Sequence, residues 1–152
     1  MTREELIKSA QALIVPSADA RQAFSAHRKE MVAQVNQQMC TRKDIDELVG
    51  SAGLGMSEDN NQNFSLFMDS LINFFHPEVL VDTVLWVFRT YRAHGFHTSY
   101  WPANLNTWKK VLEKNLSNEA TREILPFYTW LINSIPIFVK MTDSIEDTTT
   151  NG

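Results

Sequence analysis

Glycine and proline, the residues that most often interrupt helices, are scarce in this sequence, with 5 of each among 152 residues. The stretches between them carry apolar residues three and four positions apart, which is the period of an α-helix. One such stretch holds Phe64, Phe67, Met68, Leu71 and Phe75. Because few interruptions and a helical period occur together over most of the chain, the sequence predicts an all-α fold.

The starts of the helices are marked by capping residues and prolines. Thr2-Arg-Glu-Glu5 is a capping box, in which each end residue satisfies a backbone donor of the other, and it predicts an N-terminal helix over residues 2–14. Later starts are predicted at Ser17, Thr41, Ser57, Pro77, Pro102 and Ser117. We therefore expect a single domain over residues 1–152, a bundle of six to seven helices with its core in 17–141 and a flexible polar tail over 142–152.

Charge and cysteine content argue against several classes of function. The chain has 14 lysines and arginines against 18 acidic residues, a net charge of −4, and it shows no basic stripe. Attraction to nucleic acid or anionic lipid therefore has no visible source. Cys40 is the only cysteine, which excludes an internal disulfide and fits a reducing compartment.

The apolar segments favour a cytoplasmic protein. The N-terminal MTREELIKSAQ lacks the apolar core of a signal peptide. The longest apolar stretch, residues 124–139, is broken by polar residues and two prolines, and we expect it to be too short and too polar to span a bilayer. A cytoplasmic location without membrane insertion is the resulting prediction.

The last predicted helix, from Glu119 to about Met141, is apolar nearly all round, and such a helix is buried nearly all round. In a domain of this size we expect one side to meet the core and another to meet a second copy of the chain. The predicted homodimer interface comprises Trp108, Leu112, Phe127, Trp130, Ile135 and Phe138. The alternative is a monomer in which this helix runs through the core.

The histidines and the cysteine do not form a recognisable catalytic or metal site. His94 and His97 are three residues apart, but Gly95 interrupts the helix between them and no carboxylate lies within six residues. We expect one of the two to cap the last carbonyls of the preceding helix and the other to face solvent. Cys40 is expected to behave as a small hydrophobic residue. No metal site, cofactor or enzymatic activity is predicted.

The junction Tyr91-Arg-Ala-His-Gly95-Phe-His-Thr-Ser-Tyr100-Trp101 resembles the corresponding junction of bacterial globin-type sensors. In that family a haem-ligating histidine stands four residues before a glycine, and an aromatic pair opens the next helix. Here Tyr91 stands at the ligand position, and Tyr100 and Trp101 form the pair. With a phenol in place of the imidazole, the chain is similar to the haemless globin-like sensors, such as stressosome sensor N-domains and free-standing sporulation-inhibitory sensor proteins. The resemblance covers residues 17–141.

This resemblance implies a globin-like bundle that dimerises through its last two helices and holds a mainly apolar pocket. The residues expected to line the pocket are Phe64, Phe67, Met68, Leu71, Val87, Tyr91 and His94. Tyr91 and His94 are expected to orient the head group of a small apolar, fatty-acid-like ligand. The implied function is a non-enzymatic bacterial sensory module whose dimer surface is read by a signalling kinase or a scaffold protein.

Two other functions stay open at this point. The first is a haem-binding gas or redox sensor, with the iron held by His94 or Tyr91, since tyrosine is also a haem ligand. The second is a protein–protein interaction module that binds no ligand, with the pocket filled by phenylalanine and methionine side chains.

Overall fold

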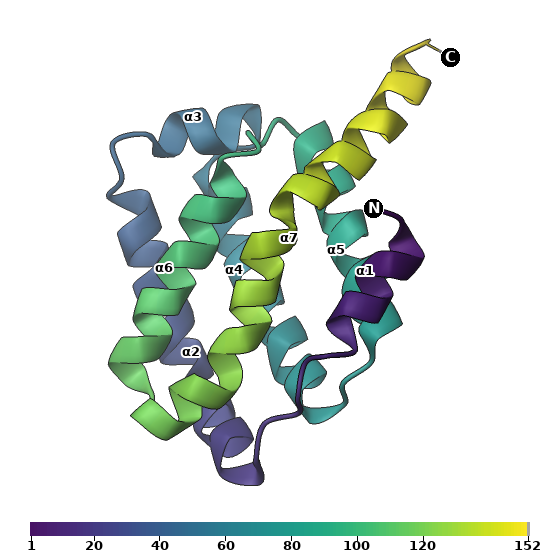
Figure 1. Cartoon of the computed structure of the whole chain (residues 1–152). Helices are drawn as coiled ribbons and strands as arrows, with labels where there is room; N and C mark the ends of the chain where they lie inside the picture. Colours follow the sequence, from purple (N-terminus) through teal and green to yellow (C-terminus); the bar gives the residue numbers. More distant parts are fainter. Residues whose placement is uncertain (152) are drawn as a thin grey trace.

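The computed structural model describes the backbone of residues 1–151 and the side chains of residues 1–143. Its helices are α1 (Arg3–Ala10), α2 (Ala18–Cys40), α3 (Ile45–Val49), the short 3-10 helix η1 (Gly50–Ala52), α4 (Leu54–Asn73), α5 (Pro77–Ala93), α6 (Tyr100–Asn115) and α7 (Asn118–Asn151) (Figure 1). No strand occurs among residues 1–151. The prediction of an all-α bundle of six to seven helices is therefore confirmed.

Several helix starts follow the local capping signals. At α1, Thr2 Oγ1 accepts a hydrogen bond from the Glu5 amide at 3.2 Å, and the Glu5 carboxylate accepts one from the Thr2 amide at 3.4 Å, which completes the capping box. Ser17 caps α2 in the same way, through a 3.3 Å bond from the Ala20 amide. Pro77 opens α5, where its missing N–H leaves no helical bond unmade.

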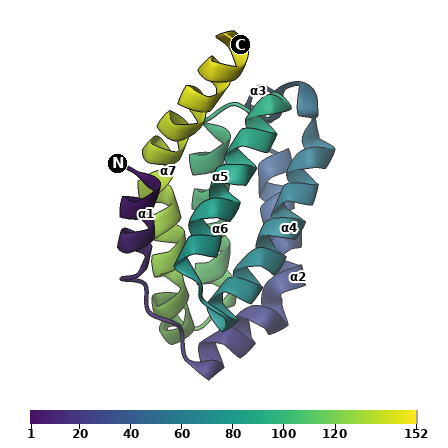
Figure 2. The same cartoon turned by 90° about the vertical axis from the view of Figure 1, so that its right-hand side faces the viewer.

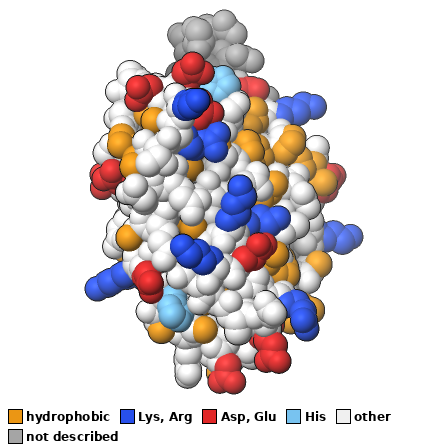
Figure 3. Space-filling model, turned by 90° about the vertical axis from the view of Figure 1, so that its left-hand side faces the viewer, with side chains coloured by type: hydrophobic (Ala, Val, Ile, Leu, Met, Phe, Trp, Pro, Cys, Tyr) orange, Lys and Arg blue, Asp and Glu red, His pale blue; other side chains and the backbone are white. Residues whose placement is uncertain are grey.

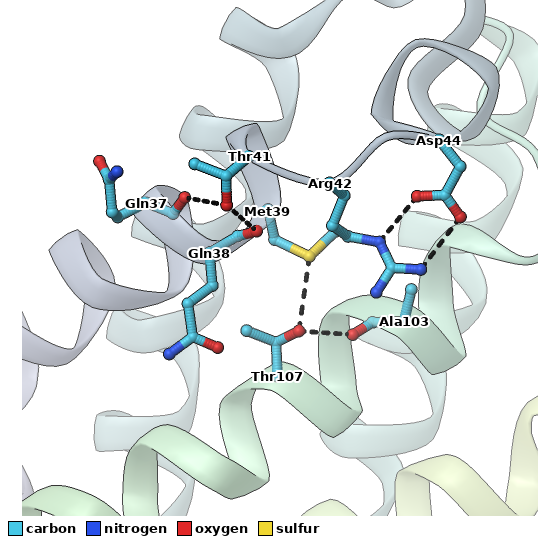
Figure 4. A network of polar contacts seen from close by, with 8 residues as sticks. All are labelled: Gln37, Gln38, Met39, Thr41, Arg42, Asp44, Ala103 and Thr107. Atoms are coloured by element: carbon cyan, nitrogen blue, oxygen red, sulfur yellow. Dashed lines mark hydrogen bonds and ion pairs between the residues drawn. The ribbon is translucent and has the colours of Figure 1, made fainter.

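Two predicted caps have other roles. Thr41 does not open a helix: its hydroxyl lies 3.2 Å from Gln37 O and 3.1 Å from Gln38 O, so it closes the end of α2 (Figure 4). Ser57 is not the start of α4, which begins at Leu54 after Gly53. Ser57 lies inside that helix, is 1% exposed, and its hydroxyl is 2.7 Å from the Tyr100 hydroxyl. A local bond to the preceding helix replaces the predicted cap at Thr41, and a long-range contact replaces it at Ser57.

The bundle is built around α2, α6 and α7, and its fully buried side chains include Trp108, Tyr100, Tyr128, Phe24, Phe127 and Phe138. Helix α2 packs against α4, α6 and α7, and α6 packs against α7. Helix α5 packs on the other side, against α1 and α7 (Figures 1 and 2). Helices α4 and α5 are therefore held by different neighbours.

Helix α7 is longer than predicted. Its Asn118–Asp143 segment has 26 residues, and the most apolar 18-residue window within it has a mean hydropathy of 1.3, so by length and composition it is able to span a bilayer, and the expectation that it is too short and too polar is wrong. The helix begins before the apolar stretch and continues beyond it. Of its most apolar window, 39% is buried inside the bundle, including Phe127, Tyr128 and Phe138. The chain's own core thus accounts for part of this apolar character.

The end of α7 is anchored beyond Met141. Thr142 is fully buried, and its hydroxyl accepts a 2.7 Å hydrogen bond from Arg92 Nη1 of α5. The helix backbone continues to Asn151. From residue 144 on, the predicted flexible tail lies outside the side chains that the structure describes.

The α5–α6 junction is fastened to the turn that follows α3. The His97 amide donates to Leu48 O at 2.9 Å, and Ser51 Oγ donates to His94 O at 3.2 Å. These bonds join segments that lie more than 40 positions apart in the sequence. Ser51 and His94, for example, are 43 positions apart. The junction therefore sets how α6 leaves the end of α5.

Candidate ligand-binding cavity

A cavity of about 190 Å³, partly open to solvent, lies between α4, α5, α6 and α7. Because α5 packs against α1 and α7 while α4 packs against α2 and α3, the two helices stand apart on the side shown in Figure 2. The lining consists of Asn60, Asn63, Phe64 and Phe67 from α4; Thr83, Val84, Trp86, Val87, Phe88 and Tyr91 from α5; Trp101, Asn104 and Leu105 from α6; and Leu131 from α7. Trp86 is 58% exposed and stands at the mouth.

Four of the predicted pocket residues, namely Phe64, Phe67, Val87 and Tyr91, line this cavity. Met68 and Leu71 do not: they are 0% and 3% exposed and lie on the face of α4 that packs into the core. The predicted apolar stripe of α4 is wide enough to serve both the core and the cavity.

His94 also lies outside the cavity lining. It is the C-cap residue of α5, it is exposed, and its Nδ1 is 2.8 Å from the Thr90 carbonyl oxygen. His97 is exposed as well, and its Nδ1 accepts a 3.1 Å bond from the Ser99 amide. The helix ends between Tyr91 and His94, so the two side chains do not share one face.

The remaining lining residues were not among the predicted pocket residues. For α4 and α5 a signal existed, because Asn60, Phe64 and Phe67 follow the helical period, as do Thr83 and Val87. The sequence places Trp101 in the aromatic pair and Leu105 and Leu131 on the apolar sides of their helices, but it gives no signal that these residues or Asn104 border a cavity.

Stacked aromatic rings form the inner wall of the cavity. The rings of Phe88 and Trp101 stack with their centroids 4.7 Å apart, and Phe88 also stacks on Phe138 of α7 at 5.5 Å. Tyr91 meets Trp101 edge-on at 5.8 Å and Phe96 at 5.0 Å. Both arrangements are favourable geometries for aromatic pairs. The wall therefore joins α5, α6 and α7.

Buried asparagines form a polar network between α4 and α6, beside the cavity. Asn61 Oδ1 accepts from Asn104 Nδ2 at 2.8 Å and from Trp108 Nε1 at 3.0 Å. Its Nδ2 donates to Asn36 Oδ1 of α2 at 2.9 Å. Asn60 Nδ2 donates to the Tyr100 hydroxyl at 3.3 Å. These bonds fix the orientation of Asn60, Asn61 and Asn104, which are at most 5% exposed.

Two atoms of lining residues lack a hydrogen-bond partner within the protein. They are Trp101 Nε1, a donor, and Asn104 Oδ1, an acceptor, and both are buried. Buried polar atoms are usually bonded, and leaving one unpaired costs about 1–3 kcal/mol. Arg21, Thr121 and Tyr128 also carry a buried atom without a partner, but none of these residues lines the cavity.

The described side chains around the cavity include no Lys, Arg, His, Asp or Glu. Burial raises the pKa of the Tyr91 phenol, and the negative charge of Asp59 raises it further, so the phenol is neutral at pH 7. Burial also raises the pKa of Tyr100, to about 12. The hydrogen bonds with Ser57 and Asn60 lower this pKa, but their effect is smaller than that of burial. The lining is thus uncharged at pH 7.

The lining does not fit a haem group. No imidazole borders the cavity, and the raised pKa of Tyr91 opposes the deprotonated phenolate that an iron ligand requires. The volume of about 190 Å³ is also below the roughly 300 Å³ at the lower end of pockets for drug-sized ligands. Within residues 1–143, no group of three or more His, Cys, Asp or Glu side chains is placed to hold a metal ion.

The residues predicted for a dimer interface lie mainly inside the chain's own core. Trp108, Leu112, Phe127 and Phe138 are at most 1% exposed, and Ile135 is 8% exposed. Trp130 is half-buried, and its Nε1 donates to Ser9 Oγ of α1 at 3.0 Å. A contact between two copies through α7 would therefore use its half-buried apolar residues, which include Leu125, Ile132, Ile137 and Val139.

The side of the molecule opposite the cavity carries charges of both signs. In Figure 3, lysine and arginine side chains lie among aspartate and glutamate side chains across this face. Cys40 is half-buried at the end of α2, and its Sγ donates to Gln37 O at 3.3 Å. Arg42 binds Asp44 in two bonds of 2.9 and 3.0 Å (Figure 4). The guanidinium group of Arg42, two positions after Cys40 in the sequence, is therefore paired with the Asp44 carboxylate.

Comparisons of the chain with protein-family models, with curated proteins and with solved structures gave no match. What the fold and the site define is a helical bundle with an uncharged, aromatic cavity. The resemblance to haemless globin-like sensors, read at the α5–α6 junction, stays a prediction.

Proposed function

We propose that the chain is a non-enzymatic sensory or regulatory module that binds a small apolar ligand in the cavity between α4, α5, α6 and α7. One observation carries this proposal: an uncharged, largely aromatic cavity of about 190 Å³, partly open to solvent, lies between these four helices, with Asn60, Asn63 and Asn104 among its lining residues. Apolar pockets with a few polar groups are typical of small-molecule sites. The resemblance of the junction to haemless globin-like sensors supports the same function.

The aromatic wall offers a route from the ligand to α7. Phe88 borders the cavity and stacks on Phe138, so a change in the position of Phe88 bears directly on the buried face of α7. One turn further along α5, Arg92 donates to Val139 O at 3.1 Å and also binds Thr142 and Asp143. A ligand that favours one arrangement of α5 would shift the population of α7 arrangements.

The output of the module is proposed to be a homodimer surface on α7. Leu125, Ile132, Ile137 and Val139 are half-buried at the edge of the core, and Pro126 and Pro136 are exposed. Partly exposed apolar side chains of this kind favour association with a partner. In the proposed function, a signalling kinase or scaffold protein in a bacterial cytoplasm reads this surface.

Cavity filling tests ligand binding. The probe is toluene, and the measurement is the rise in melting temperature that a ligand bound to the folded state produces. In Val87→Phe the added ring occupies part of the cavity, whereas Val79→Phe makes the same change on α5 at an exposed position outside the lining. We expect toluene to stabilise the unmodified chain and Val79→Phe, and to have little effect on Val87→Phe.

Two results would contradict the proposal. If toluene leaves the melting temperature of the unmodified chain unchanged, the cavity does not take apolar ligands, and a ligand-free interaction module becomes the better description. If Val87→Phe responds as strongly as Val79→Phe, the ligand binds elsewhere.

A further inference from the structure

The sequence of α7 is nearly palindromic in residue type about Leu131. At most positions from 119 to 143, residues at equal distances before and after Leu131 are chemically alike. The matched pairs include Trp130 with Ile132, Thr129 with Asn133, Pro126 with Pro136, Leu125 with Ile137, Arg122 with Lys140, and Glu119 with Asp143. Leu131 itself is 4% exposed and belongs to the core. The palindrome therefore has its midpoint on the buried side of the helix, at a defined level along it.

The side of α7 opposite Leu131 lies on the molecular surface. Because an α-helix has 3.6 residues per turn, residues two, five and nine positions from Leu131 in either direction lie on this side. They form the outward stripe: Arg122, Pro126, Thr129, Asn133, Pro136 and Lys140. Thr129 is half-buried and the others are exposed. Figure 1 shows α7 along the front of the bundle, and in Figure 2 it lies at the edge, beside α1. Both halves of the palindrome are thus presented to the outside.

The bundle leaves much of the apolar surface of α7 uncovered. Residues 124–139 include no charged residue, and only 39% of the most apolar window of the helix is buried. Uncovered apolar surface of this kind marks a contact with another protein or with a membrane. Thr129 and Asn133 lie in the middle of the outward stripe, and a polar group without a hydrogen-bond partner is costly in lipid. A protein that offers hydrogen bonds at this level is therefore a better fit than lipid.

A second copy of the chain offers those hydrogen bonds when it lies antiparallel. In a pair of helices that cross at the level of Leu131, each residue faces the residue of the other copy at the mirrored position. Thr129 then faces the partner's Asn133, and by symmetry the same hydroxyl–amide pair occurs twice. Pro126 likewise faces the partner's Pro136. A two-fold dimer requires a self-complementary patch. In a parallel pair each residue would face its own copy, so the palindrome matches only the antiparallel arrangement.

The charges at the two ends of the outward stripe are complementary in the same arrangement. The partner's Asp143 lies within one helical turn of Arg122, and the partner's Glu119 lies within one turn of Lys140. When the helices cross at a shallow angle of about 20°, these side chains stay within reach of each other. Each end of the contact combines Glu119 and Arg122 of one copy with the partner's Lys140 and Asp143. The charges at each end therefore sum to zero.

We propose that two copies of the chain associate through the outward stripes of α7, antiparallel, with the two-fold axis at the level of Leu131. This inference rests on the homodimer that the proposed function assigns to α7. It adds the orientation of the two copies and the residues that face each other across the axis.

Disulfide cross-linking tests the orientation. The exposed prolines Pro126 and Pro136 are each replaced by cysteine in a Cys40→Ser background, so that only the introduced thiols are present. Neither replacement removes a helical hydrogen bond, since proline has no N–H. In the proposed dimer Pro126 and the partner's Pro126 are about 15 Å apart along the helices, given the 1.5 Å rise per residue. A disulfide requires Cα atoms within about 7 Å.

Mixing the two single variants should therefore give a cross-linked dimer under mild oxidation with copper phenanthroline, whereas neither variant should cross-link alone. Val79→Cys in the same background places a thiol at an exposed position of α5, away from the outward stripe, and should not cross-link with any of the three. Circular dichroism of each variant checks that the helical fold is kept.

A charge near the axis gives a second test that needs no cysteine. In the proposed dimer Asn133 and the partner's Asn133 lie about 6 Å apart along the helices. Asn133→Asp should weaken the dimer at least about tenfold, because like charges brought together in an interface are costly. Asn106→Asp makes the same change at an exposed position of α6 and should leave the dimer unchanged. Sedimentation equilibrium of the full chain measures both dissociation constants.

The results that overturn the inference differ from those that overturn the proposed function. Cross-linking of a single variant with itself would show a parallel pair. A dimer that gives no cross-link in the mixture, or that is unaffected by Asn133→Asp, would place the interface elsewhere. Each of these results rejects the inference and leaves a homodimer. A chain that is monomeric in sedimentation, including one that binds phosphatidylcholine vesicles, would reject the homodimer of the proposed function as well, whereas the toluene measurement decides ligand binding separately.

Discussion

Gly50 and Gly95 touch backbone to backbone: a Cβ atom added to Gly50 would lie 2.2 Å from the carbonyl oxygen of Gly95. Both residues have positive φ angles, 57° for Gly50 and 107° for Gly95, which other residues rarely adopt. The bonds from His97 to Leu48 and from Ser51 to His94 flank this contact. The turn after α3 thus holds the α5–α6 junction in place, and with it Tyr91 and Trp101 of the cavity.

Gly50→Ala should therefore lower the free energy of unfolding by about 1–3 kcal/mol, the cost of a strained backbone, or more if the two turns separate. Gly55→Ala is the control, because a Cβ there meets nothing within 4 Å and Gly55 lies inside α4. It should be neutral or stabilising by about 0.4–1 kcal/mol. Urea unfolding followed by circular dichroism measures both. Equal stability of the two variants would mean that the contact between the turns is not important.

Arg92 joins α5 to the last turns of α7, and its loss should free them. Its side chain is 13% exposed, and it donates to Val139 O and Thr142 Oγ1 and pairs with Asp143. Arg92→Met should cost about 1.5–3 kcal/mol, the range for bonds to a charged group, and should speed amide hydrogen exchange around residues 138–143. Arg89→Met, at an exposed position of the same helix, should change neither quantity. Unchanged exchange in Arg92→Met would rule out this link between α5 and α7.

The three tyrosines should resist ionisation until the chain unfolds. Burial is the main cause that raises the pKa of Tyr91, Tyr100 and Tyr128, that of Tyr100 to about 12, from an unperturbed value of 10.0. A folded-state pKa above the unfolded one gives stability that is fully present below pH 10 and is lost as the pH rises through the folded-state value. The free energy of unfolding should thus fall between pH 10 and about 12.

Phenolate absorbance and helical circular dichroism, recorded in one alkaline titration, check this expectation. The two signals should change together, because ionisation accompanies unfolding. Half of the full phenolate absorbance near pH 10 with the helical signal intact would show that the tyrosines are accessible to solvent in the folded chain.

The parts of the fold that the sequence predicts are those that depend on neighbouring residues. The caps at Thr2 and Ser17 and the start at Pro77 need only a few adjacent residues, and they are where they were predicted. Thr41 and Ser57 carry the same local signal, but Thr41 bonds back to the last turn of α2 and Ser57 has a distant partner. Ser57, for example, pairs with Tyr100, which is 43 positions away. A side chain that has a distant partner cannot be recognised from its own helix.

The same limit explains the site. Periodicity places Phe64, Met68 and Leu71 on one broad stripe of α4, but it does not show which edge of that stripe borders a cavity. Only Phe64 of these three does so. The role of Asn104 cannot be predicted from its own helix, because its hydrogen-bond partner Asn61 lies 43 positions away on α4. Likewise, because α7 is apolar nearly all round, the sequence does not predict which of its sides meets the core. In the structure that side carries Phe127 and Phe138.

The proposed homodimer makes the last prediction. Because Phe127 and Phe138 are already buried, two copies would associate through the outward residues of α7, and a charge placed among these residues should separate them. Ile137→Glu should convert a dimer to a monomer, since a buried unpaired carboxylate is far more costly than a lost apolar contact. Val79→Glu makes the same kind of change at an exposed position of α5 and should leave the dimer intact. Sedimentation equilibrium distinguishes the two states. A monomer in the unmodified chain, or a dimer that survives Ile137→Glu, would contradict an interface on this face and leave α7 as a helix that serves only the core.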